Sequence, residues 1–207
     1  LDLSCGKGAE IIRMSDFENA EAFYDYIKEK GFGVVEEYLI NHDKIREVYE
    51  PALNTMRMIT IIGDDNEPHL FFAAQKFGVN GRFIDVHGIH APIDLETGIV
   101  HFPFHSGNTD TDLIYTKHPD TGYDLTNYEV PMFKEAKEMI LRAAMKVPEM
   151  RYVGWDVAVT NKGPKIVEGN DYTAYDYMQL PYQNPSRIGV IPDILKLVPS
   201  FKDELYK

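Results

Sequence analysis

The sequence predicts an α+β fold in which helices flank an antiparallel sheet, and two kinds of segment predict it. Strand-like runs rich in β-branched and large apolar residues lie at 56–62 and 70–78, and two further runs between 155 and 170 are joined by a tight turn. Strands joined by so short a turn pair in antiparallel fashion. Stretches with apolar residues at helical spacing, at 15–30 and 131–147, predict helices with one apolar face.

The boundaries of these elements follow from local signals. Ser15 and Glu18 have the spacing of a capping box, so the first helix is expected to begin at Ser15 and to end at Gly31. A strand is expected at 33–39. Pro131 is expected to open the second long helix and Pro148 to end it. Residues 107–127 read as a long polar loop, and the tail from Ile191 as a short helix.

Composition limits the classes of function. The chain has 207 residues, of which 44% are hydrophobic, which is enough for one domain with a sizeable core. Its net charge of −12 argues against a nucleic-acid partner, which needs a basic face. One cysteine rules out an internal disulfide framework and suits the reducing cytoplasm, our expected location. No run of about 20 apolar residues predicts a membrane span.

The segment 155–170 is the most informative part of the chain. A three-residue loop at 161–163 would set Thr160 opposite Pro164, and the same register would set Asp156 opposite Glu168. Asn170 lies two residues further and shares that face. Paired carboxylates without a counter-charge are costly unless a cation lies between them, and oxygen ligands favour Mg²⁺ or Mn²⁺. The alternative is an exposed hairpin whose acidic side chains are solvated.

Three further features leave two interpretations open. Arg57 has apolar neighbours and needs an anionic partner, either a carboxylate in a structural salt bridge or a phosphoryl group being transferred. The short loop containing Ser4, Gly6, Lys7 and Gly8 could bind phosphate or be an ordinary turn, and it is no Walker A motif. Histidines at 87, 90, 101 and 105 suggest zinc only superficially, because the cysteines and tight turns of structural zinc motifs are missing.

Asp156 followed twelve residues later by Glu168-Gly169-Asn170 resembles the magnesium site of the ATP-grasp superfamily. The exact residues in and around this motif resemble the branch of sugar-transfer-associated ATP-grasp proteins. The segments that carry this resemblance are Asn54-Thr55-Met56-Arg57, Pro92-Ile93-Asp94-Leu95-Glu96-Thr97-Gly98, His118-Pro119-Asp120-Thr121-Gly122 and Gly154 to Asn170.

The resemblance implies an ATP-grasp fold of which this chain is the C-terminal portion, the N-terminal lobe being absent. Residues 1–50 would form a nucleotide-covering loop and hinge, and residues 51–207 a lobe that binds metal and phosphate. The loop with Ser4, Gly6, Lys7 and Gly8 would fold over the ATP phosphates. The adenine would lie against Glu36, Glu37, Tyr38 and Leu39, with Asp43 near the ribose and with Lys117 and His118 as substrate contacts.

The activity implied by the resemblance is ATP-dependent ligation of a carboxylate to an amine or a similar nucleophile through an acyl phosphate, and the family name suggests polysaccharide or cell-envelope assembly. Asp156, Glu168 and Asn170 would hold Mg²⁺ or Mn²⁺, and Arg57 would stabilise the charge on the transferred group. The partners would be the nucleotide, a small-molecule acid and its acceptor. A phosphotransferase on the same scaffold and a non-catalytic nucleotide-binding module are the alternatives.

Overall fold

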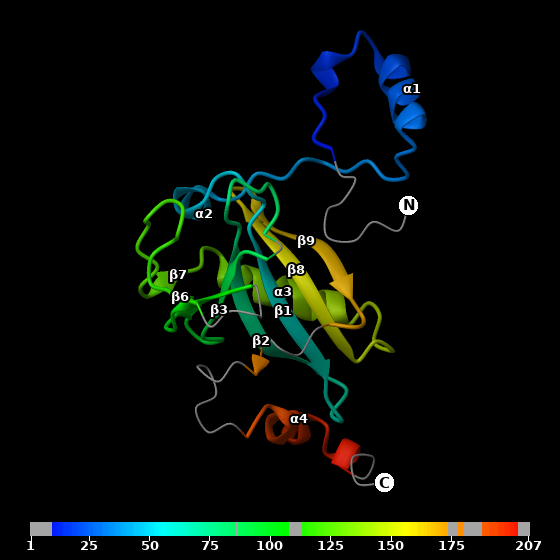
Figure 1. Cartoon of the computed structure of the whole chain (residues 1–207). Helices are drawn as coiled ribbons and strands as arrows, with labels where there is room; N and C mark the ends of the chain where they lie inside the picture. The colour runs from blue at the N-terminus through cyan, green and yellow to red at the C-terminus, as the bar shows by residue number, and fades with distance from the viewer. Residues whose placement is uncertain (1–9, 86, 108–112, 174–177, 180–187, 203–207) are drawn as a thin grey trace. The chain divides into compact units, whose positions relative to one another are not determined.

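The structure, a computed structural model, describes residues 10–85, 87–107, 113–173, 178–179 and 188–202 (Figure 1). The chain forms two compact units, Leu1–Leu39 and Ile40–Lys207.

The first unit contains the short 3₁₀ helix η1 (Met14–Asp16) and the helix α1 (Ala20–Lys30). The side chain of Asn19 caps α1 by accepting a hydrogen bond from the backbone N–H of Ala22 at 2.9 Å. Gly31 ends α1 in the left-handed conformation with φ 71°, as predicted. The predicted start at Ser15 is wrong because Ser15 lies inside η1, and Asn19 provides the cap four residues later.

The strand predicted at 33–39 is also wrong. Residues 32–42 carry no regular secondary structure, and most of their side chains are exposed. A strand needs a neighbouring strand for its backbone hydrogen bonds. Within the described residues of the first unit there is none, only α1 and η1, so β propensity alone does not produce a strand here.

The second unit is built on a seven-stranded sheet whose order is β6-β5-β3-β2-β1-β8-β9, with every neighbouring pair antiparallel. This confirms the α+β class with a large antiparallel sheet. The strands are β1 (Thr55–Ile62), β2 (Pro68–Phe77), β3 (Ile89–Pro92), β5 (Phe104–Ser106), β6 (Ile114–Tyr115), β8 (Tyr152–Thr160) and β9 (Gly163–Asn170).

Smaller elements complete the second unit. β4 (Ile99–Val100) and β7 (Tyr128–Glu129) form a separate two-stranded sheet. The helices are α2 (Asp43–Val48), α3 (Phe133–Ala144) and α4 (Ile191–Leu197), followed by the 3₁₀ helix η3 (Pro199–Phe201). Within the part of the chain that the structure describes, no helix is long and apolar enough to cross a membrane.

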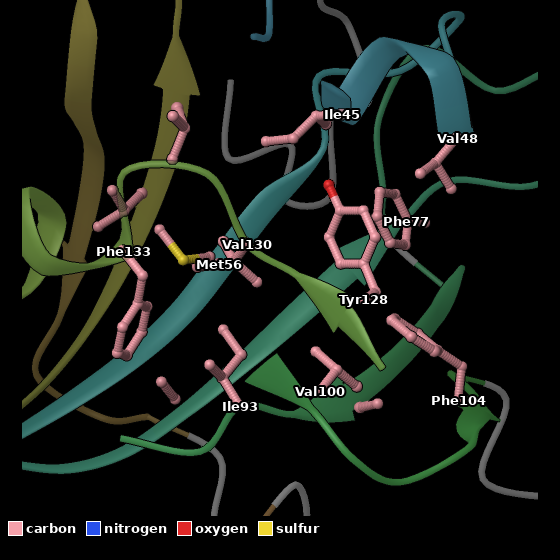
Figure 2. Close-up of a cluster of buried hydrophobic side chains, with 14 of the residues drawn as sticks. Ile45, Val48, Met56, Phe77, Ile93, Val100, Phe104, Tyr128, Val130 and Phe133 are labelled. Atoms are coloured by element: carbon pink, nitrogen blue, oxygen red, sulfur yellow. The ribbon is translucent and has the colours of Figure 1, made fainter. Parts of the chain in front are cut away.

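The hydrophobic core lies between one face of the large sheet and α3, which Figure 1 shows running behind β1 and β8. Met56 on β1, Phe77 on β2 and Ile140 on α3 are each at most 1% exposed. Figure 2 shows how side chains of β1, β2 and β7 meet in this cluster. Because side chains alternate along a strand, the residues between these core positions point to the other face of the sheet.

Candidate functional site

The other face of the large sheet carries polar and charged side chains, and it is called the polar face below. Directly opposed residues of an antiparallel pair share a face, so the registers of five strand pairs define it. Its members are Thr55 and Arg57 on β1, Lys76 on β2, His90 on β3, His105 on β5, Asp156 on β8, and Glu168 and Asn170 on β9.

The β8–β9 hairpin sets Asp156 opposite Glu168. This pairing was predicted, but the predicted loop was wrong. Thr160 pairs with Gly163, so the loop has two residues instead of three. The register then shifts beside Asp156, where Val167 is the extra residue of a β-bulge in β9. The bulge restores the offset that the shorter loop removed, so both carboxylates lie on the polar face.

Arg57 lies directly opposite Asp156 on the neighbouring strand β1 and binds it through two parallel hydrogen bonds. Arg57 Nε donates to Asp156 Oδ1 at 2.9 Å, and Nη2 donates to Oδ2 at 3.2 Å. Arg57 Nη1 also donates to Thr173 Oγ1 at 2.9 Å. A guanidinium has five N–H donors in a rigid fork, so this arrangement fixes both oxygens of the carboxylate.

Thr173 reaches Arg57 because position 154 is a glycine. A Cβ at Gly154 would lie 2.2 Å from Thr173 Oγ1 and 2.5 Å from its Cβ. No side chain larger than hydrogen fits there without moving Thr173. Gly154 also pairs with Asn170 across β8 and β9. Thr173, which lies over Gly154 and contacts Arg57, is therefore close to both the ion pair and the predicted metal ligands.

Lys76 adds a second cation to the polar face. Its Nζ lies 3.3 Å from Asp156 Oδ1 and 3.3 Å from Asp85 Oδ1. Asp85 is 8% exposed, and its Oδ2 accepts hydrogen bonds from the backbone N–H and the hydroxyl of Thr55, each at 2.7 Å. Two cations and two carboxylates therefore form one connected, largely buried network.

This network corrects one premise of the sequence analysis. Asp156 does not lack a counter-charge, because both Arg57 and Lys76 approach it. The cost of uncompensated carboxylates therefore does not by itself require a metal ion. It also means that the structural salt bridge considered for Arg57 is present.

The donor set nevertheless fits a hard divalent cation. Glu168 is exposed, its Oε1 accepts from Asn170 Nδ2 at 3.1 Å, and both residues lie beside Asp156. A carboxylate has about four lone-pair sites, so Asp156 retains capacity after accepting from Arg57 and Lys76. Two carboxylates and an amide supply the all-oxygen environment that Mg²⁺ and Mn²⁺ prefer.

His90 and His105 extend the polar face toward the far edge of the sheet, where they pair across β3 and β5 with ring centroids 6.4 Å apart. Burial, with the neighbouring His105 and Lys76, lowers the pKa of His90 to about 4. His90 is therefore neutral at pH 7. Among the described residues, no group of three or more His, Cys, Asp or Glu side chains is arranged to hold a metal ion, so the histidine series forms no zinc site there.

The other predicted site residues have different surroundings. Asp43 opens α2, and its Oδ1 accepts from Nδ2 of Asn161, at the tip of the β8–β9 hairpin, at 3.0 Å. Lys117 is exposed, and it forms an isolated backbone bridge with Asp124. The exposed Glu36, Glu37 and Tyr38 and the half-buried Leu39 belong to the first unit. Ser4, Gly6, Lys7 and Gly8 lie outside the described residues.

His118 has a packing role. It is 1% exposed, its ring stacks on Tyr49 at 4.8 Å, and its Nε2 lies 2.9 Å from the carbonyl oxygen of Gly78. Burial lowers the pKa of His118, so the ring is neutral at pH 7.

Comparison with known proteins decides the family. The sequence profile of the family described as sugar-transfer associated ATP-grasp matches residues 8–188, which is most of the chain. The chain belongs to the sugar-transfer-associated ATP-grasp family. Neither the curated proteins nor the solved structures contain a significant match. Membership supports nucleotide binding and an ATP-dependent role at a coarse level, with small molecules as substrates.

Several ATP-grasp motif residues prove to be structural. Asn54 is fully buried, and its side chain bonds to the carbonyl oxygens of Tyr49 and Ala52 and to the N–H of Gly78. Asp94 organises the turn that ends at Gly98. These residues fix the connections between strands, so they place the polar face without contributing to its chemistry.

Lys76 on the polar face, and Asp85 and Thr173 that contact its charged residues, were not predicted as site residues. Lys76 carried a usable signal, since it is the one charged residue between Leu70 and Gly78, as Arg57 is between Asn54 and Ile62. The contacts of Asp85 and Thr173 follow from tertiary structure that one-dimensional patterns do not report.

Proposed function

We propose that this chain contributes the metal- and phosphate-binding face of an ATP-dependent ligase, which joins a small-molecule carboxylate to an amine or a similar nucleophile. One observation carries the proposal: Arg57, Asp156 and Glu168 stand in one row across the adjacent strands β1, β8 and β9. This row combines a fixed guanidinium with a carboxylate pair, which is the pattern needed to neutralise and orient polyphosphate.

Asp156, Glu168 and Asn170 would hold Mg²⁺ or Mn²⁺, which when bound neutralises the charge of the nucleotide phosphates. The arrangement of the chain supports this assignment. Glu168 and Asn170 lie two residues apart on β9 and face Asp156 and Gly154. The fork of Arg57 holds the Asp156 carboxylate in a fixed orientation, so little entropy is lost when the site is completed.

Arg57 would stabilise charge on the phosphoryl group being transferred. Its hydrogen bonds to Asp156 and Thr173 use three of the five N–H donors of a guanidinium. The donors that remain can meet an anion on the polar face. The Arg57 side chain is 16% exposed, so it is partly shielded from water. Electrostatic stabilisation is stronger at such a shielded position than in bulk water.

For the nucleotide, we keep the assignments made from sequence. Each is a separate prediction: Glu36, Glu37, Tyr38 and Leu39 as adenine contacts, Asp43 as a ribose contact, and Ser4, Gly6, Lys7 and Gly8 as phosphate contacts. Lys117, which is exposed, remains a candidate substrate contact. His118 also stays a candidate substrate contact, although its side chain is buried.

The proposed reaction has two balanced steps. An oxygen of the substrate carboxylate attacks the γ-phosphorus of ATP, the bond to the β,γ-bridging oxygen breaks, and ADP leaves. The acceptor nitrogen then attacks the carbonyl carbon of the acyl phosphate, loses a proton and displaces inorganic phosphate. The side chains on the polar face supply positioning and electrostatic stabilisation, and none needs to act as a nucleophile.

Calorimetric titration of the full chain with Mg²⁺ and a non-hydrolysable ATP analogue tests the nucleotide assignment. We expect Glu168→Gln to weaken binding at least about tenfold, because it removes a charged metal ligand. Glu149→Gln, at an exposed position, is the matched control and should bind like the wild type. Equal affinity of the wild type and Glu168→Gln would refute the proposed site.

Product analysis tests the reaction. Incubation with ATP and a panel of carboxylic acids and amines should release inorganic phosphate together with an amide. A stable phosphorylated acceptor would instead identify a phosphotransferase. Saturable nucleotide binding with no turnover for any acid–acceptor pair would identify a non-catalytic module.

A further inference from the structure

The polar face contains one more cation than is needed to orient Asp156. Arg57 alone contacts both carboxylate oxygens, through Nε at 2.9 Å and Nη2 at 3.2 Å. Thr173 in turn fixes the remaining end of the guanidinium. The orientation of Asp156 is therefore set without Lys76, and the presence of a second cation at Oδ1, the Lys76 ammonium group, needs another explanation.

Two carboxylates fix the position of the buried Lys76 ammonium group. The residue is 8% exposed, and its Nζ is shared between Asp156 and Asp85 at 3.3 Å each. Asp85 is anchored by the backbone and hydroxyl of Thr55. Burying an ammonium ion is costly unless it is paired, so the protein maintains two carboxylates to keep this one cation here.

Charge counting gives the consequence. Arg57 and Lys76 carry two positive charges, and Asp156 and Asp85 carry two negative charges, so the network is neutral with no divalent ion bound. A divalent ion that shares the Asp156 carboxylate must do so next to a fixed ammonium group. At such short range in a partly buried site, repulsion between like charges is substantial.

We propose that Lys76 is the built-in counter-cation of the metal site: it neutralises Asp156 when no divalent ion is bound and lowers the affinity of the site for that ion. This inference rests on the metal site proposed above. Asp85 shares the ammonium group and so limits how strongly Lys76 binds Asp156. Removing Lys76 therefore tightens metal binding, and removing the charge of Asp85 weakens it.

Binding of Mn²⁺ to the full chain, followed by the electron paramagnetic resonance signal of the free ion, tests the proposal. We expect Lys76→Met, which removes the charge but keeps the length, to bind Mn²⁺ about tenfold more tightly, and Asp85→Asn to bind it about tenfold more weakly. Lys76→Arg keeps the charge, and its affinity should stay within about threefold of the wild type. These opposite signs distinguish the proposal from a purely structural role, in which both substitutions would weaken binding.

Thermal unfolding provides a second readout that does not depend on activity. Without a metal, Lys76→Met leaves the buried Asp85 with no ion-pair partner among the described residues, so the melting temperature of this variant should fall below that of the wild type. Saturating Mn²⁺ should then raise the melting temperature of Lys76→Met more than that of the wild type, since tighter binding gives more stabilisation. If Lys76→Met fails to fold, Lys76→Gln, which also removes the charge, takes its place and should likewise bind Mn²⁺ more tightly than the wild type.

The failures are distinguishable. Saturable Mn²⁺ binding that Glu168→Gln weakens, but that Lys76→Met and Asp85→Asn leave unchanged or both weaken, would overturn the role of Lys76 and keep the metal site. If Mn²⁺ does not bind the wild-type chain saturably, or binds Glu168→Gln equally well, the metal site itself is wrong and the counter-cation role with it.

Discussion

The two faces of the large sheet are made by the same strands, yet different interactions stabilise them. On β1 the core residues Met56 and Met58 flank Arg57, and on β8 the core residue Val157 follows Asp156. The core face is stabilised by apolar packing against α3, whereas the polar face is a network of paired charges. On the core face, an apolar residue can be replaced by another of similar volume at little cost in stability. On the polar face, removing one member of a buried ion pair leaves its partner's charge uncompensated, so the two faces should respond differently to substitution.

The largest loss of stability is expected on the core face. Phe77→Ala should lower the free energy of unfolding by about 3–5 kcal/mol, because it removes a ring that is fully buried and leaves a cavity. Phe83→Ala, at a position that is 43% exposed, is the matched control and should cost about 1 kcal/mol or less. Chemical denaturation measures both. A similar loss for both variants would show that the core is not where the structure places it.

On the polar face, stability and binding should separate. Asp156→Asn should lower the free energy of unfolding by about 3 kcal/mol, since it leaves Arg57 and Lys76 short of a negative charge. Glu168→Gln is exposed and should change stability by about 0.5 kcal/mol or less. Both should nevertheless impair Mn²⁺ binding. An unstable Glu168→Gln variant, or a stable Asp156→Asn variant, would contradict this difference.

Acid should weaken the fold through the polar face. The pKa of His90 is about 4 in the folded protein and 6.5 for an ordinary histidine, so the unfolded chain takes up the proton first as the pH falls. The free energy of unfolding therefore falls as the pH drops from about 6.5 to 4, by about 3 kcal/mol in total, and His90 causes no such loss above about pH 6.5. We expect His90→Gln to lose less stability than the wild type between pH 7 and pH 4, as measured by urea denaturation at each pH. Parallel pH profiles for the two proteins would contradict this.

The hairpin shows how far sequence reasoning reaches. Alternation and a turn signal predicted that Asp156 faces Glu168, and the structure confirms it. The predicted three-residue loop was wrong, and the pairing survives because Val167 forms a bulge. Two compensating irregularities of one residue each leave no trace in the hydrophobic pattern, so a correct pairing did not require a correct loop.

The errors in the first unit have a different cause. Ser15 and Glu18 satisfy the spacing of a capping box, but Asn19 caps the helix, because several residues in this segment can provide a cap and local spacing does not rank them. The stretch 33–39 has β propensity but no strand partner among the described residues of its unit. Propensity predicts an element only when the surrounding structure can complete it.

The site was predictable where chemistry and strand register coincide. Arg57, Asp156, Glu168 and Asn170 stand out by residue type and spacing, and they share the polar face. Lys76 and Asp85 come from segments distant in sequence and reach Asp156 or its partner only through the folded sheet. The packing of the His118 ring on Tyr49 and Phe77 was not predicted, because the polar stretch around His118 gave no sign of burial.

The central claim is that a divalent ion binds on the polar face beside Asp156, Glu168 and Asn170. Paramagnetic broadening of backbone amide signals in the nuclear magnetic resonance spectrum, on addition of substoichiometric Mn²⁺, tests it most directly. We predict that the signals of these three residues and of Gly154 and Thr173 broaden first and most strongly, while those of β6, at the other edge of the sheet, broaden least. Broadening that instead centres on the exposed acidic residues around Glu96 and Glu135, with Asp156 and Glu168 unaffected, would contradict the account.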